Sequence, residues 1–225
     1  MYFGDIKVKD SLNCILAHTI IINNKTIKKG TIISKNVQNY FIENKIKTIV
    51  CAKLDKNDFH EDEAANKIAN LFKNTSIAIE KAYTGRANIL ASRSGLLIIN
   101  KDIVNKFNMI HDDVTIATLN NNSTVKKGEM IATIKIISFS VKSFFINKIQ
   151  KLICKKAFNI KPYNHKKCAL ILTHYKKENL KLNSISMQRI KDRLSNLNSS
   201  LNYVSTCEHE AKNISKLINH NLKKK

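Results

Sequence analysis

Alternating apolar and polar positions predict that residues 1–56 form a small α+β unit. Two β-prone runs, residues 20–22 and 31–33, flank the polar turn Asn23-Asn24-Lys25 and predict a hairpin. Ser34 can cap a helix, because the following apolar side chains recur at spacings of three to four residues. Residues 46–52 then have the pattern of a strand, which completes this unit.

Short β-prone runs dominate the next segment, residues 57–154. His60-Glu61-Asp62-Glu63 predicts the start of a helix, where acidic side chains suit the helix dipole, and capping is favoured over catalysis for this cluster. Glycine-rich and asparagine-rich turns separate the runs, which predicts a mostly antiparallel barrel or sandwich, and helical spacing returns at residues 144–153. The β-prone runs are residues 77–79, 87–90, 95–99, 114–119 and 130–139.

One short motif occurs twice in these two segments. Thr26-Ile27-Lys28-Lys29-Gly30 is echoed by Thr124-Val125-Lys126-Lys127-Gly128, and a β-prone run follows each copy. Both glycines are therefore expected to supply the positive φ of a tight turn. A hairpin tip is favoured over a turn that carries a modified lysine.

The pattern changes after residues 155–167, a polar, lysine-rich stretch that is expected to be a linker. The continuous apolar run 168–173 is typical of a buried parallel strand, and a helix (186–197), a strand (201–206) and a helix (208–218) follow it. This β-α-β-α order predicts the beginning of a doubly wound α/β sheet. Two strands make a thin core, so residues 168–225 are expected to be a truncated domain or one that another chain completes.

Composition narrows the function classes. The 39 Lys and Arg against 17 Asp and Glu give a net charge of +22, but 35 of the 39 cations are lysines, which suit bidentate phosphate and base contacts less well than arginines. A solvated lysine surface is therefore favoured over a nonspecific nucleic-acid binder.

No apolar run approaches the roughly 18–20 residues of a membrane span, and no signal peptide pattern opens the chain, so we expect a cytoplasmic protein. The five scattered cysteines are expected to be reduced and mostly buried.

Few residues carry recognisable chemistry. The chain has no Gly-x-Gly-x-x-Gly, no P-loop, no Gly-x-Ser-x-Gly and no His-Glu-x-x-His motif. Cys207-Glu208-His209-Glu210 could bind a metal, although helix-start residues explain it better. In the segment 83–88, Arg86 either is buried and braces a turn or contacts an anion. Thr173 ends a predicted parallel strand, the edge where open α/β sheets bind ligands, and Ser184 either caps the next helix or holds a phosphate.

Four motifs stand out in the second segment: His60-Glu61-Asp62-Glu63-Ala64-Ala65, Tyr83-Thr84-Gly85-Arg86-Ala87-Asn88-Ile89, Gly95-Leu96-Leu97-Ile98-Ile99-Asn100 and Ala132-Thr133-Ile134-Lys135-Ile136-Ile137-Ser138-Phe139. In this order and spacing they resemble motifs of bacterial molybdopterin-binding proteins related to molybdopterin molybdotransferase. Leu172-Thr173, Asn183-Ser184 and Cys207-Glu208-His209-Glu210 resemble the opening of the molybdopterin-binding domain of that family. The resemblance implies accessory α+β units followed by the start of a three-layer α/β domain.

The same resemblance implies a function in molybdenum cofactor biosynthesis. It implies molybdopterin or its adenylylated form as ligand, Mg²⁺ as a possible cofactor, and Thr173, Asn183, Ser184 and Glu210 as ligand-binding residues. The family often has aspartate at the position of Asn183, and its third strand and glycine-rich phosphate loop would follow Asn219, where this sequence has neither. We therefore expect a truncated or degenerate member, whose catalytic activity stays open.

The alternative to a molybdopterin-binding protein is a binding module without catalysis, namely a protein-interaction scaffold. In that case the β-rich units would serve as a platform, and the unfinished α/β unit would dock on a second copy or on a partner chain through its exposed strand edge.

Overall fold

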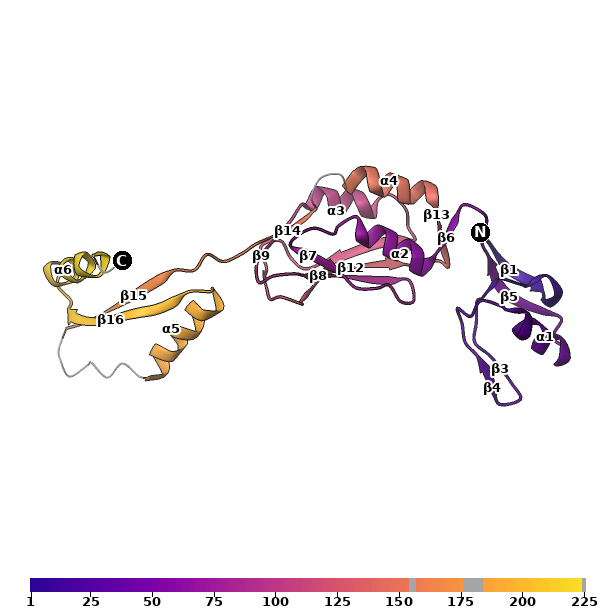
Figure 1. The fold of residues 1–225 in the computed structure, drawn as a ribbon, viewed down its shortest axis with the longest axis horizontal. Helices are drawn as coiled ribbons and strands as arrows, with labels where there is room; N and C mark the ends of the chain where they lie inside the picture. The colour runs from indigo at the N-terminus through magenta and orange to yellow at the C-terminus, as the bar shows by residue number, and fades with distance from the viewer. Residues whose placement is uncertain (154–156, 176–183, 224–225) are drawn as a thin grey trace. The chain divides into compact units, whose positions relative to one another are not determined.

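The structure is a computed structural model that describes residues 1–153, 157–175 and 184–223, without the side chains of residues 184–186. The chain divides into two compact units, Met1–Lys161 and Pro162–Lys225, which are described separately. The described residues form six α-helices and several small, mostly antiparallel sheets (Figure 1), so the mixed α and β content expected from the sequence is confirmed.

The first part of unit 1 is a three-stranded sheet packed against helix α1, Lys35–Glu43. The sheet has the antiparallel order β1–β5–β2, with β1 at Tyr2–Lys7, β5 at Thr48–Lys53 and β2 at Ile15–Leu16. Ser34 caps α1 as predicted, because its hydroxyl accepts a hydrogen bond from Val37 N at 3.4 Å. This part has an apolar core of its own, formed by Ile6, Val8, Cys14, Leu16, Ile27, Ile33, Phe41, Ile49 and Cys51.

The predicted hairpin has a different second strand. Strand β3, Ile20–Ile22, pairs with β4, Lys25–Ile27, rather than with residues 31–33. Asn23 and Asn24 have φ values of 46° and 62°, and two such residues in succession close a two-residue hairpin at once. Ile32 instead forms an isolated bridge with Ile15.

Two of the five thiols lie in this core. Burial raises the pKa of Cys14. The pKa of Cys51 is raised to about 12, mainly by burial and to a smaller extent by the neighbouring Cys14. Cys168 and Cys207 are half-buried in unit 2, and Cys154 lies outside the described residues. Of the four described cysteines, Cys14 and Cys51 meet the expectation of buried thiols, and Cys168 and Cys207 do not.

The rest of unit 1 consists of open antiparallel sheets, in the orders β10–β12–β8–β7, β11–β9–β14 and β13–β6. A closed barrel requires the first and last strands of one sheet to pair, and within the described strands β7 and β10 remain outer edges, so the predicted barrel is wrong. Strand β14 lies within the stretch expected to be a linker. The strands are β6 Asp58–His60, β7 Ile77–Ile79, β8 Arg86–Ala91, β9 Gly95–Ile99, β10 Val114–Thr118, β11 Thr124–Val125, β12 Met130–Ile136, β13 Ser140–Lys142 and β14 Phe158–Lys161.

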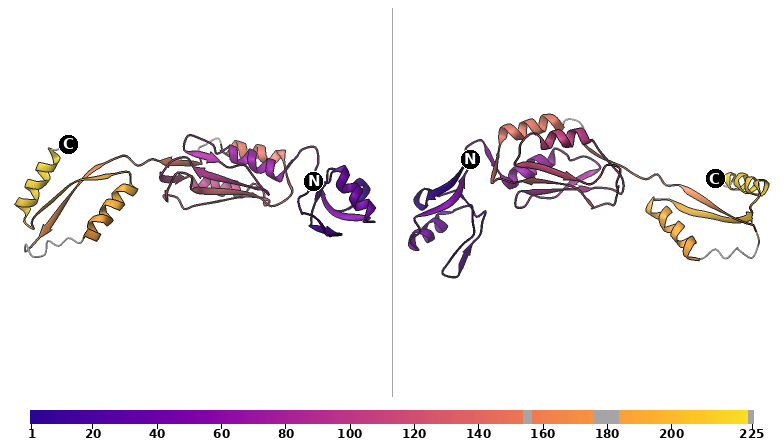
Figure 2. Two further views of the ribbon diagram at one scale, coloured as in Figure 1. Left: turned by 60° about the horizontal axis from the view of Figure 1, so that its bottom comes forward. Right: turned by 180° about the vertical axis from the view of Figure 1, so that it is seen from behind.

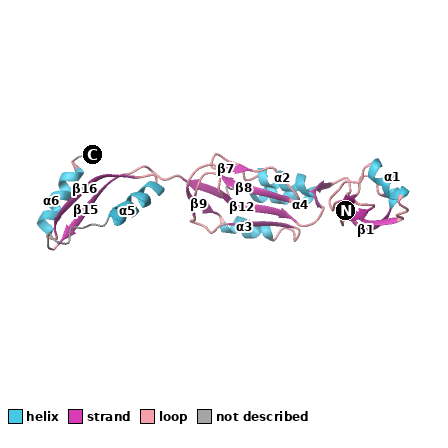
Figure 3. Ribbon diagram, turned by 90° about the horizontal axis from the view of Figure 1, so that it is seen from below, coloured by secondary structure: helices cyan, strands magenta, loops and turns pink. Residues whose placement is uncertain are grey.

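Three helices lie on one side of these sheets (Figures 1 and 3). Helix α2, Glu61–Asn70, packs on β8 and β12; helix α3, Lys101–Asn108, packs on β10; and helix α4, Ser143–Ile153, packs on α2 and α3. The predicted capping of α2 is confirmed, because His60 Nδ1 accepts from Asp62 N at 3.3 Å. In the described part of the chain, no helix is long and apolar enough to cross a membrane.

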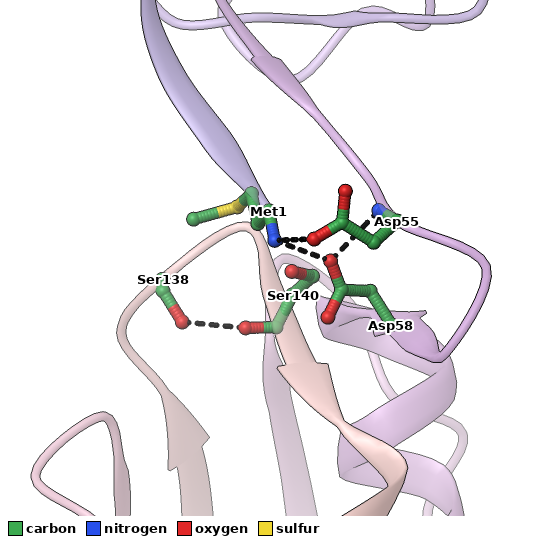
Figure 4. A network of polar contacts seen from close by, with 5 residues as sticks. All are labelled: Met1, Asp55, Asp58, Ser138 and Ser140. Atoms are coloured by element: carbon green, nitrogen blue, oxygen red, sulfur yellow. Dashed lines mark hydrogen bonds and ion pairs between the residues drawn. The ribbon is translucent and has the colours of Figure 1, made fainter.

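The chain start joins the two parts of unit 1 (Figure 4). The Met1 ammonium lies 2.5 Å from an Asp55 carboxylate oxygen and 2.8 Å from one of Asp58. The rings of Phe3 and Phe139 stack at 6.1 Å between centroids. These contacts connect β1 to the start of β6 and to the segment before β13.

Unit 2 is a parallel strand pair with two helices, as the β-α-β-α pattern predicts. Strand β15, Lys167–His174, pairs with β16, Ser200–Glu208. Helices α5, Ser184–Asn196, and α6, Ala211–Leu222, lie on opposite sides of the pair in both views of Figure 2. Among the described residues of this unit no side chain is buried, which agrees with the thin core expected for two strands.

Candidate functional site

The carboxyl ends of β15 and β16 bring together two of the segments that carry candidate chemistry. Parallel pairing sets Thr173 opposite Cys207 and His174 opposite Glu208. Because both strands run the same way, residues 172–175 and 207–210 lie at one edge of the sheet. In open parallel sheets ligands bind at this edge.

His209 connects the two strands at this edge. Its Nδ1 lies 2.9 Å from Thr173 Oγ1, and its backbone N–H donates to His174 O at 2.9 Å. Its ring centroid is 4.7 Å from that of Tyr175, whose side chain is 82% exposed. One hydrogen bond thus orients the imidazole and a second anchors the backbone of the same residue, and the exposed tyrosine ring lies next to the imidazole.

A second imidazole belongs to the same edge. The His174 side chain is half-buried, but its Nδ1 atom is shielded from solvent and has no hydrogen-bond partner among the described residues. A buried, unpaired polar atom is costly in a folded protein. The edge therefore contains one imidazole oriented by a hydrogen bond and a second whose Nδ1 has no partner in the described part of the chain.

Glu210 starts helix α6. It occupies the N-cap position but its side chain makes no capping hydrogen bond; instead its Oε2 accepts from Asn213 Nδ2 at 3.4 Å. The helix-start explanation of Cys207-Glu208-His209-Glu210 is confirmed in part, since α6 begins directly after it. Within the described residues, no group of three or more His, Cys, Asp or Glu side chains could hold a metal ion.

The remaining two predicted site residues are not placed. Asn183 lies outside the described residues, and Ser184 begins α5 but its side chain is not described. Of the predicted set, the structure brings Thr173 to the segment that contains Glu210, and the residue that makes the contact is His209. The sequence signal for His209 was its place directly after a parallel strand, in the cluster 207–210.

The second candidate segment, residues 83–88, forms a turn in unit 1. Arg86 is exposed, so the interpretation as a buried arginine is wrong. Asp62 Oδ1 accepts from Gly85 N at 2.7 Å, and Lys135 Nζ donates to Thr84 O at 2.8 Å. The turn is therefore held by helix α2 and strand β12, and the contact of Arg86 with an anion stays a prediction.

One acidic group close to this turn is perturbed. Burial raises the pKa of Glu61, and the nearby charges of His60, Lys135 and Lys29 oppose that rise. Its backbone N–H donates to Phe139 O at 3.0 Å, which fixes the first residue of α2. The position of Glu61 at the start of α2, next to the turn at Gly85, accounts for its burial.

Comparison of the chain with models of known protein families, with curated proteins and with solved structures found no match. The resemblance to molybdopterin-binding proteins thus stands on the motifs quoted above.

Proposed function

We propose that this chain binds molybdopterin or its adenylylated form at the carboxyl ends of β15 and β16, as a member of the molybdenum cofactor biosynthesis machinery in the cytoplasm. The observation that carries the proposal is the 2.9 Å contact between Thr173 Oγ1 and His209 Nδ1. It joins two segments, Leu172-Thr173 and 207–210, that the resemblance singles out independently and that lie more than 30 residues apart in the sequence.

The chemistry of this edge suits a phosphorylated heterocycle. The Thr173 hydroxyl can donate a hydrogen bond to a phosphate or pterin oxygen, and helix α6 begins directly after β16, at the same end of the sheet. Residues 162–225 contain 13 Lys and Arg against four Asp and Glu, so their field attracts an anionic ligand. Because the described residues offer no metal-holding group, the proposal includes no step that needs Mg²⁺ bound by the protein.

An equilibrium titration of molybdopterin into the 225-residue chain tests the proposal. Saturable one-to-one binding that survives a severalfold increase in salt is expected, since a built site depends less on salt than a lysine surface does. Thr173→Val should weaken binding about tenfold, because it removes a hydroxyl that contacts the ligand or orients His209.

Thr206→Val is the matched control, since Thr206 lies on β16 outside the Thr173–His209 contact and should bind like the wild type. No binding, or binding that the higher salt abolishes, would overturn the proposal.

A protein-interaction module is a second candidate, and the exposed apolar side chains of unit 2 favour it. Val204 is 47% exposed, Ile218 45% and Leu222 56%, although they lie on the strand and helix that should bury apolar faces. Sedimentation velocity over a range of chain concentrations tests self-association. A chain that stays monomeric, with amides after residue 155 that exchange as in an unfolded chain, would contradict this candidate.

A further inference from the structure

We propose that Tyr175 and His209 form the wall on which the planar pterin ring of the ligand stacks. This inference rests on the proposed function and deepens it, because it assigns the recognition of the ring, rather than the phosphate, to two residues outside the predicted site set.

The first argument is the exposure of Tyr175. A tyrosine ring carries a large apolar surface, and this one is 82% exposed at the end of β15. Its described ring neighbour is His209, at 4.7 Å between centroids and 46° between planes. One face of this aromatic pair is therefore available to solvent at the edge where the proposed ligand lies.

The second argument is the fixed position of His209. Thr173 Oγ1 holds its Nδ1, and the carbonyl of His174 holds its backbone N–H. A ring whose orientation is set before binding loses little entropy when a ligand stacks on it.

The third argument is the chemistry of the ligand. A pterin is a planar, electron-poor bicyclic ring, and aromatic side chains recognise such rings through their π faces. The Thr173 hydroxyl lies within hydrogen-bonding distance of the same imidazole, so ring stacking and phosphate or oxygen contacts can be made at one edge.

Fluorescence titration with neopterin monophosphate, a fluorescent pterin that carries a phosphate, tests this inference in the full chain. Tyr175→Ala should weaken binding about tenfold or more and reduce the quenching of pterin fluorescence in the complex. Tyr175→Phe keeps the ring and should bind like the wild type. Tyr83→Ala is the matched control, because Tyr83 is a similarly exposed tyrosine, at 77%, in unit 1.

The outcomes separate the two proposals. If Tyr175→Ala binds the probe like the wild type while Thr173→Val weakens molybdopterin binding, the stacking wall is overturned and the proposed function stands. Loss of binding in Tyr175→Phe would overturn stacking too, since it would assign recognition to the hydroxyl. If the wild-type chain binds neither the probe nor molybdopterin, both proposals fall.

Discussion

The carboxylate of Asp58 shows how one residue can make the fold sensitive to acid. Its side chain is 1% exposed, it lies 2.8 Å from the Met1 ammonium, and it accepts from Asp55 N at 2.8 Å. Burial alone would raise the pKa of Asp58, but the hydrogen bonds from Met1 and from the Asp55 backbone outweigh burial and lower it. The charged form is therefore stabilised by the folded state.

This shift predicts the sign of a pH effect. A carboxyl whose pKa is lower in the folded than in the unfolded state contributes stability above its unfolded pKa and loses it as the pH falls through the folded pKa. Asp58→Asn should cost about 1–3 kcal/mol at neutral pH and flatten the loss of stability below about pH 4, measured by urea unfolding between pH 3 and 7. Asp55, whose side chain is 67% exposed, provides the control, and Asp55→Asn should have the smaller effect. Equal pH profiles for wild type and Asp58→Asn would contradict this account.

At the scale of elements, the echoed sequence motif forms the same turn twice. Gly30 and Gly128 have φ values of 83° and 85°, and their N–H groups donate at 2.8 Å to Leu16 O and Ala91 O. In both turns the backbone N–H of the lysine before the glycine donates to a hydroxyl. Lys29 N donates to Thr19 Oγ1, and Lys127 N donates to Ser94 Oγ. The predicted positive φ of both glycines is confirmed.

These turns predict a matched pair of substitutions. A Cβ at Gly30 or Gly128 would meet no heavy atom within 4 Å, so only backbone strain opposes alanine there. Gly30→Ala and Gly128→Ala should each lower the free energy of unfolding by about 1 kcal/mol, measured by urea unfolding. Lys28→Ala and Lys126→Ala in the same turns should stay within about 0.5 kcal/mol of the wild type. Unequal losses for the two glycines would show that the turns are not equivalent.

The elements also show what the sequence could and could not predict. Strands β7, β8, β9, β10 and β12 were predicted nearly residue by residue, because alternate burial follows the apolar pattern closely. Helix α3 was missed, since only Ile103 and Phe107 of its eight residues are buried and its start depends on the Asn100 side chain, which accepts from Ile103 N. The hairpin turn was predicted at Asn23-Asn24-Lys25, but the partner strand was wrong, because the apolar pattern does not show that positive φ at both asparagines closes the hairpin within two residues.

The sequence predicted the place of one residue of the candidate site, Thr173, but not its contact with His209. The place of Thr173 at a strand end follows from one apolar run. Its contact with His209 depends on the register between two strands 36 residues apart, and the shift in that register between Cys168 and Ala169 cannot be derived from periodicity.

At the scale of the whole molecule, the two units differ in how much they bury. Unit 1 contains two apolar cores, whereas no described side chain of unit 2 is buried. Backbone hydrogen bonds that lack buried surroundings open more often, so amides of β15 and β16 should exchange faster than those of β8 and β12. A ligand that binds only the folded form of unit 2 should slow that exchange.

Hydrogen exchange of the full chain with and without molybdopterin, followed by mass spectrometry, tests the central claim most directly, because it locates the site without a substitution. The account predicts added protection at residues 172–175 and 207–210, at the carboxyl ends of β15 and β16, and little change in the sheets of unit 1. Unchanged exchange at both segments under saturating molybdopterin, or protection confined to unit 1, would contradict it.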